Sequence, residues 1–214
     1  MEGIGLSDMR YSGFKSFEGM VLYSSPNVGP KVTPGKYNIK MTYNNLVFQE
    51  EFEIVKDPRV KISQADYQDQ LEFLIDVRDE VSKANQQIID IRSIKNNMNF
   101  ILDKTKDNNE LQEMINKYLD DISVVENNIH MTKNQSRQDP LNFGIRINNR
   151  IAFLLADSQR GDYPPTDQSK EFFSQVKEEL NIEIINLKAL IEKHSQKIED
   201  YLMKNKIELI SLKN

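Results

Sequence analysis

The two histidines of the chain, His130 and His194, are the side chains best suited to acid–base or metal chemistry near neutral pH. A zinc site needs several histidine, cysteine or carboxylate ligands at helical or loop spacing. Neither histidine has another histidine near it in the sequence, and the chain contains no cysteine. We therefore interpret both histidines as packed or solvated side chains and predict no metal ligand.

Adjacent carboxylates are the second set of residues that could do chemistry. A glycosidase needs two carboxyl groups that face each other across a cleft, about 5 to 10 Å apart. The acidic pairs fall on the polar sides of predicted helices or in a predicted hairpin, where solvation explains them. The pairs are Glu50-Glu51, Asp120-Asp121, Glu178-Glu179 and Glu199-Asp200. The sequence thus predicts no catalytic residue, and it leaves open whether the chain is an enzyme.

Other short motifs give no stronger indication. The chain has no glycine-rich phosphate loop and no G-x-S-x-G nucleophile motif, so we expect no cofactor and no cofactor-binding residue. An Arg-Gly-Asp tripeptide occurs at Arg160–Asp162, but a turn between two helices explains it equally well, since two prolines follow.

Composition excludes two classes of partner. The chain has 214 residues, of which 29% are charged, and a net charge of −5, so it lacks the basic surplus that nucleic-acid binding requires. No apolar run approaches the roughly 18 residues of a membrane-spanning helix. We expect neither a nucleic-acid partner nor a membrane span.

The N-terminal part, residues 1–58, carries most of the β signals. Alternating apolar residues over Tyr37–Tyr43 predict a half-buried strand, and Asn44-Asn45 suits a tight turn. The return strand over Leu46–Val55 places Phe48, Phe52 and Ile54 on one face, with Glu50 interrupting it. A short β-prone run covers Met20–Tyr23. Because two strands do not form a stable sheet alone, we expect this segment to be poorly ordered, to pair with another chain, or to pack on the helices.

Aromatic residues are concentrated in the same part of the chain. An exposed aromatic row could bind sugar or peptide, but we favour burial of these rings against other strands. The residues are Phe14, Phe17, Tyr23, Tyr37, Tyr43, Phe48 and Phe52.

Helical periodicity begins near Ser63, which we predict to cap a first helix of about forty residues. Asn108 or Asn109 caps a second helix that ends near Ile129. Asp139-Pro140 is expected to start a third helix that carries Leu141 through Leu155. Thr166 caps a long last helix whose apolar seam includes His194. Long amphipathic helices with short connections predict an antiparallel up-and-down bundle of three to four helices over residues 59–214. The fold class is therefore mainly α, with a small β part.

Several phrases, taken in order, give the chain a resemblance to a known family. They are "DMRY" at Asp8–Tyr11, "GP" at Gly29-Pro30, "PGKY" at Pro34–Tyr37, "DPR" at Asp57–Arg59, and the helical stretches that contain "QADYQDQLEFLIDVRDEV" and "LNFGIRINNRIAFLLADSQRGDYPP". This order resembles the C-terminal region of large bacterial secreted proteins with sortilin-like or BNR-repeat β-propellers, commonly labelled glycosyl hydrolases.

The resemblance implies that residues 1–58 are the last strands of an Ig-like module and that an upstream propeller is the partner. The propeller is missing from this sequence, so no catalytic residue of the family can be transferred. The first hypothesis is therefore a non-catalytic accessory or interaction module, with glycan or peptide as further possible partners. A contribution to the substrate cleft of a glycosyl hydrolase or peptidase and a coiled-coil adaptor are the alternatives. A longer secreted parent implies a periplasmic or extracellular location, whereas a chain complete as given, without a signal peptide, implies the cytoplasm.

Overall fold

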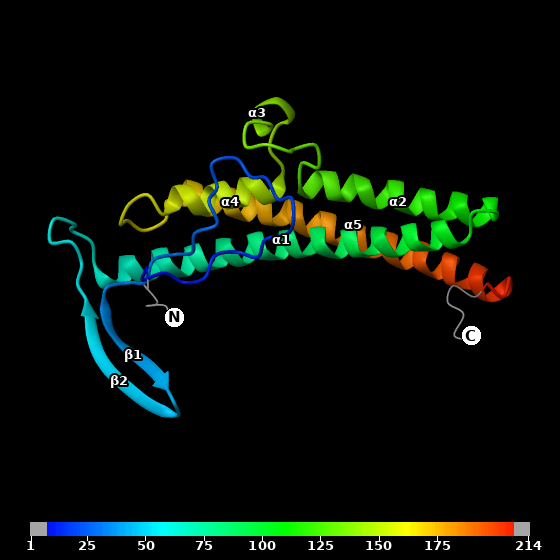
Figure 1. Cartoon of the computed structure of the whole chain (residues 1–214). Coiled ribbons are helices and arrows are strands. Elements are labelled where there is room, and N and C mark those ends of the chain that lie inside the picture. The colour runs from blue at the N-terminus through cyan, green and yellow to red at the C-terminus, as the bar shows by residue number, and fades with distance from the viewer. Residues whose placement is uncertain (1–7, 208–214) are drawn as a thin grey trace.

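The computed structural model describes residues 8–207 and is mainly helical, with one small antiparallel sheet (Figure 1). This confirms the predicted fold class. The elements follow in the order β1 (Gly35–Tyr43), β2 (Leu46–Ile54), α1 (Gln64–Lys104), α2 (Asn109–Ile129), α3 (Pro140–Phe143), α4 (Ile147–Ser158) and α5 (Asp167–Lys204).

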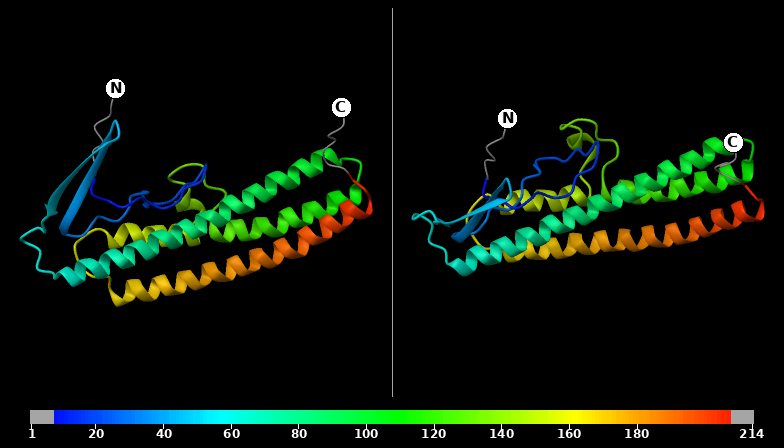
Figure 2. Two further views of the ribbon diagram at one scale, coloured as in Figure 1. Left: turned by 90° about the horizontal axis from the view of Figure 1, so that it is seen from below. Right: turned by 60° about the horizontal axis from the view of Figure 1, so that its bottom comes forward.

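The bundle has three antiparallel arms rather than four. α1 and α5 are the two long arms, of 41 and 38 residues. α2 and α4 lie end to end and together form the third arm, as both views show (Figures 1 and 2). α1 therefore packs on α4 along its first half and on α2 along its second half.

Local capping sets the ends of the long helices where the sequence predicts them. The Ser63 side chain accepts a hydrogen bond from the Asp66 amide, and the Asp66 carboxylate accepts one from the Ser63 amide, which completes a capping box. Asn108 caps α2 through the Leu111 amide.

α5 is capped in the same way. The Thr166 side chain accepts a hydrogen bond from the Ser169 amide. These bonds satisfy amide groups that would otherwise lack partners.

The prediction of one third helix is wrong, because the structure has two separate helices there. The first starts at Pro140 but ends after one turn at Phe143, because Gly144 adopts a positive φ of 78° that breaks the helical path. α4 then begins at Ile147. The Asp139 carboxylate accepts hydrogen bonds from the Gln135 and Ser136 amides and does not cap α3.

The core follows the predicted apolar seams. Side chains from all three arms are fully or almost fully buried, including Val77, Val81, Ile88, Leu111, Ile115, Ile122, Ile151, Leu155, Val176, Leu180 and Leu187. Burial of each such side chain contributes about 1.5–3 kcal/mol, so the bundle closes on itself without help from another chain.

An extended strap, residues 8–33, lies along the bundle over α1 and α4 (Figure 2). Its Phe14 ring is only 3% exposed and belongs to the bundle core. The Asn85 amide donates to the Lys15 carbonyl over 2.6 Å, and the Asn149 amide donates to the Tyr23 carbonyl over 3.0 Å. The predicted β-prone run at 20–23 is not a strand here but part of this strap.

The hairpin of β1 and β2 projects from the end of the bundle where α1 begins (Figures 1 and 2). No Cα atom of either strand lies within 8 Å of a helix in the described part of the chain. Three outcomes were expected for the hairpin, and one of them is wrong: the two strands do not pack on the helices.

Candidate functional site

The hairpin is built by a tight turn with a defined geometry. Asn44 and Asn45 have φ angles of 46° and 64°, and two positive φ values at the central positions define a type I′ turn. This turn matches the twist of the flanking strands and fixes the register. Tyr43 lies opposite Leu46, Ile39 opposite Glu50 and Gly35 opposite Ile54.

One side of the hairpin, the apolar face, carries all of its aromatic rings. Because side chains alternate between the two sides of a strand, the register places eight large apolar residues together. They are Tyr37, Ile39, Met41, Tyr43, Leu46, Phe48, Phe52 and Ile54. Ile39 and Met41 are each 58% exposed, and Phe48 is 48% exposed. Exposed apolar surface of this kind is uncommon on a monomer, so this face is the candidate interaction site.

The opposite side of the hairpin is a polar, solvent-exposed face. It presents mostly charged and polar side chains, and the Lys36 ammonium lies 3.1 Å from the Glu51 carboxylate across the strands. This difference between the two sides identifies the face that a partner would cover.

Glu50 lies at the centre of the apolar face, opposite Ile39. Its side chain is exposed, and within the described part of the chain no hydrogen bond or ion pair holds its carboxylate. A partner that covered this face would have to supply a cation or a hydrogen-bond donor to the Glu50 carboxylate, since burial of an unpaired charge is costly.

A cavity of about 200 Å³ lies at the root of the hairpin, where the apolar face meets the bundle. Ile54 and Pro34 line it from the hairpin side, and Tyr67, Leu71 and Leu74 line it from α1. The cavity continues the apolar face, because Ile54 is on the same side of β2 as Phe52.

Polar contacts at this root join α1 to the loop after α4 and to the residue before β1. The Tyr67 hydroxyl donates to Asp162 over 3.2 Å. Burial, assisted by the nearby Asp162 charge, raises the pKa of Tyr67, so this hydroxyl stays protonated as a donor. The Gln64 amide donates to the Pro34 carbonyl over 2.9 Å. These contacts hold α1 to the segments on either side of the cavity.

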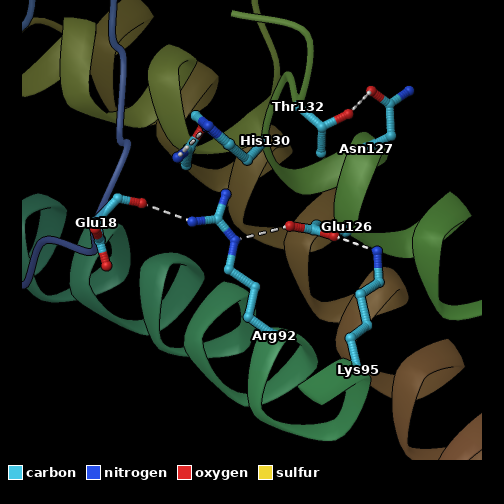
Figure 3. Close-up of polar contacts among 8 residues, drawn as sticks. Glu18, Arg92, Lys95, Glu126, Asn127, His130 and Thr132 are labelled. Atoms are coloured by element: carbon cyan, nitrogen blue, oxygen red, sulfur yellow. Dashed lines mark hydrogen bonds and ion pairs between the residues drawn. The ribbon is translucent and has the colours of Figure 1, made fainter. Parts of the chain in front are cut away.

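His130 lies in a buried polar cluster at the junction of α2, the strap and α4 (Figure 3). It is 2% exposed, and its Nδ1 lies 3.2 Å from the Asn148 amide nitrogen, which also donates to Asn85. Burial lowers the pKa of His130, with the Asn148 hydrogen bond opposing this shift. The Phe17 ring of the strap meets the imidazole edge-on at 4.9 Å.

The neighbouring ion pairs extend this cluster to the strap. Arg92 donates to the Glu18 carbonyl over 2.7 Å and to the Glu126 carboxylate over 3.0 Å (Figure 3). Lys95 lies 2.6 Å from the same carboxylate. Burial acts to raise the pKa of Glu126, but hydrogen bonds from Lys95 and Arg92 outweigh it, and the pKa is lowered. The cluster fastens the strap to the bundle.

His194 is the centre of a second, separate cluster. Its Nε2 lies 2.9 Å from Asp121, and its ring stacks on Tyr118 with 4.9 Å between centroids. The Lys117 hydrogen bond and the His194 contact lower the pKa of Asp121. The pair lies within the interface of α2 and α5. Both histidines are therefore packed side chains.

The acidic pairs do not converge on one cleft. Glu179 is paired with Arg150, and the Asp200 carboxylate accepts a hydrogen bond from Gln196 on its own helix. In the Arg160–Asp162 tripeptide, the Gly161 carbonyl accepts from Gln70 and Asp162 accepts from Tyr67. Over residues 8–207, no group of three or more histidine and carboxylate side chains could hold a metal ion.

The predicted aromatic cluster is divided by the structure. Phe14 is in the bundle core, and Phe17 packs against it beside His130. Tyr43 and Phe48 are exposed on the hairpin, so the expected burial of these rings against other strands is wrong for the described residues. Sequence reasoning missed the buried asparagines Asn85 and Asn148, since asparagine is ordinarily a surface residue.

Comparison with known proteins identifies no relative: no family model, no curated protein and no solved structure matches the chain. Across residues 8–207, every helix is too short or too polar to cross a bilayer.

Proposed function

We propose that the chain is a non-catalytic accessory module that binds a β-rich partner through the apolar face of its hairpin. The observation that carries this proposal is the contrast between a closed bundle core and a projecting hairpin with Ile39, Met41 and Phe48 about half exposed. A two-stranded sheet is marginal in water, and coverage of its apolar face by a partner would stabilise it.

The charge at the centre of the face favours a different polypeptide over a second copy. Two hairpins stacked face to face about a twofold axis through the centre of the apolar face would bring two Glu50 carboxylates into one interface, and like charges there are unfavourable. A partner that presents lysine or arginine opposite Glu50 gains a charge-assisted contact. The proposed partner is therefore an apolar sheet surface with one basic side chain.

The resemblance noted from the sequence suggests where such a partner comes from. In that reading, the hairpin completes an Ig-like module next to a sortilin-like or BNR-repeat propeller, in the periplasm or outside the cell. The phrases that support this proposal lie in the strap, at the start of the hairpin and, at Asp57–Arg59, just after its end.

The two alternatives receive less support. A coiled-coil adaptor would have to dimerise through its helical seams, but seam residues such as Ile88 and Ile122 are already fully buried within the chain. A hydrolase would need two carboxyl groups facing each other across a cleft, and the acidic pairs of the described residues lie on separate surfaces.

The proposal is tested by measuring the binding of this chain to a separately expressed Ig-like or propeller domain of the resembled family. We expect saturable binding by calorimetry that Ile39→Ser with Phe48→Ser abolishes. Gln49→Ser, on the polar side of the same hairpin, is the matched control and is expected to bind like the wild type. Glu50→Lys is expected to weaken binding by about tenfold or more, as an opposed charge pair becomes repulsive.

Two outcomes would overturn the proposal. Binding that is unchanged by the apolar-face substitutions would show that another surface is used. Turnover of an aryl glycoside or peptide by the purified chain, lost on substitution of a single acidic residue, would show that the chain is catalytic.

A further inference from the structure

The cavity at the root of the hairpin lies where four separate segments of the chain meet. The end of the strap, the end of β2, α1 and the loop after α4 all line its volume of about 200 Å³. Pockets for drug-sized ligands usually measure about 300–1,000 Å³, whereas an apolar cavity of about 150 Å³ holds one benzene ring. The cavity therefore has room for the ring system of a single side chain.

The wall that α1 contributes to this cavity is mostly apolar. Tyr67, Leu71 and Leu74 line it, and all three side chains are buried. Ile54 continues the apolar wall on the hairpin side. Such a lining favours an aromatic ring over a strongly hydrated group.

Gln70 places one free acceptor in the same wall. It is only 8% exposed, and its Nε2 donates to the Ser158 and Gly161 carbonyls over 3.0 and 2.7 Å. Because both neighbours are carbonyl oxygens, they fix which end of the amide is the nitrogen. No hydrogen bond from residues 8–207 reaches the Gln70 Oε1, and Gln70 lines the cavity. A ligand that fills the cavity therefore has to offer this oxygen a donor.

The formal charges around the cavity balance. Two lysines and two aspartates line it, namely Lys31, Lys56, Asp57 and Asp162. The Asp57 carboxylate is already paired with Arg59 over 2.6 Å, and the Asp162 carboxylate accepts from the Tyr67 hydroxyl. Because a charged group would meet no surplus of opposite charge here, a neutral ligand fits the lining best.

We propose that this cavity receives the indole ring of a tryptophan side chain on the partner that covers the apolar face. An indole is neutral, has one N–H donor and no acceptor, and adds one fused ring to the size of benzene. Its N–H donates to the Gln70 Oε1 while its ring packs on Tyr67 and Leu71. Tryptophan is a frequent anchor of protein interfaces. The inference rests on the proposed function, since the cavity continues the apolar face at Ile54.

Two isomeric probes test the cavity without any partner. The probes are 3-methylindole, which is the tryptophan side chain, and 1-methylindole, which has the same size but no N–H. In proton–nitrogen correlation spectra of the full chain, we expect 3-methylindole to cause saturable shifts at the Gln70 side-chain amide and at the Leu71 and Leu74 backbone amides. We expect 1-methylindole to bind about tenfold more weakly, because it leaves the Gln70 oxygen unsatisfied. Absence of saturable shifts, or equal binding of the two isomers, would overturn the proposal.

Two valines of the strap provide a matched pair of variants. Val32 lines the cavity, and Val28 does not. Val32→Phe should fill the cavity and weaken 3-methylindole binding by about tenfold or more, whereas Val28→Phe should leave it unchanged. Equal binding by the two variants would overturn the assignment to this cavity. The comparison of isomers uses the unmodified chain, so it decides the proposal even where Val32→Phe fails to fold.

Calorimetry with the Ig-like or propeller domain distinguishes this inference from the proposed function. We expect Val32→Phe to weaken partner binding by about tenfold or more, because the anchor side chain loses its place. Partner binding that is unchanged in Val32→Phe, while 3-methylindole binding is lost, would show that the cavity serves a free small molecule and would overturn the tryptophan proposal. The proposed function would stand in that case, because its test depends on Ile39 and Phe48.

Discussion

Ile88 in α1 and Ile39 in β1 are the same residue type with opposite environments: Ile88 is fully buried, and Ile39 is 58% exposed. The same contrast holds for whole regions, because the bundle covers its apolar seams within the chain while the hairpin leaves its apolar face open. The closed core of the bundle stabilises the chain. We propose that the exposed apolar face of the hairpin binds a partner.

The largest expected difference between bundle and hairpin is in the stability lost when Ile88 or Ile39 is shortened to alanine. Ile88→Ala is expected to lower the free energy of unfolding by about 2–5 kcal/mol, because it leaves a cavity in a closed core. Ile39→Ala should change it by less than about 0.5 kcal/mol. Urea unfolding followed by far-UV circular dichroism measures both. A similar loss in the two variants would mean that the hairpin is part of the cooperative core.

Two ion-paired glutamates, Glu126 in the bundle and Glu51 in the hairpin, allow the two regions to be compared again. Glu126→Gln removes the charge that neutralises Arg92 and Lys95 in a mostly buried setting, and we expect a loss of about 1–3 kcal/mol. Glu51→Gln breaks the exposed pair with Lys36 and should cost less than about 0.5 kcal/mol. The same urea titrations give both values. Equal costs would contradict the view that Glu126 fastens the strap.

Acid should weaken the bundle through His130. Its pKa in the folded chain is lowered from the ordinary value of 6.5, so the unfolded chain binds more protons as the pH falls through that value. Stability due to the neutral His130 is full above pH 6.5 and is lost below it, by at most about 1.4 kcal/mol per pH unit. His130→Gln should flatten this slope as the pH falls below 6.5.

The other titratable group of this cluster acts at lower pH. The Glu126 carboxylate, whose pKa is lowered, loses its contribution only as the pH falls below its ordinary 4.5, so it does not account for a slope that begins at pH 6.5. An unchanged slope in His130→Gln would assign the acid sensitivity to another group.

The smallest effect concerns the turn. Asn45→Gly introduces the preferred Asn-Gly sequence of a type I′ turn and should stabilise the hairpin by about 0.5 kcal/mol. Slower exchange of the Met41 and Tyr43 amides, with an unchanged melting temperature of the bundle, is the expected result. A parallel rise in melting temperature would show that the two regions unfold together.

Features that depend on near neighbours in the sequence were predictable. Ser63, Asn108 and Thr166 cap their helices through residues three positions away, and Asn44-Asn45 forms the turn through its own backbone preference. The end of the helix at Phe143 was not predictable, because apolar spacing continues past Gly144 and hides the break.

Features that depend on distant neighbours were beyond the sequence. The strap has no periodicity of its own, and its anchors Asn85 and Asn149 are 70 and 126 residues from the groups they bind. The hairpin itself was predicted, but its alternating pattern is the same whether the apolar face is covered or open. Only the placement of β1 and β2 away from the helices decides that.

The interrupted third arm has a consequence for the order of folding. α1 and α2 are joined by the short connection 105–108, so the end of the bundle that they form closes through local contacts. At the other end, the connection 159–166 brings α4 and α5 together locally, but this pair and the strap must return to α1 from distant positions in the sequence, which costs more loop entropy. We therefore expect the end remote from the hairpin to form first. The root of the hairpin is then assembled last, so newly made chains expose their apolar face before its support is complete.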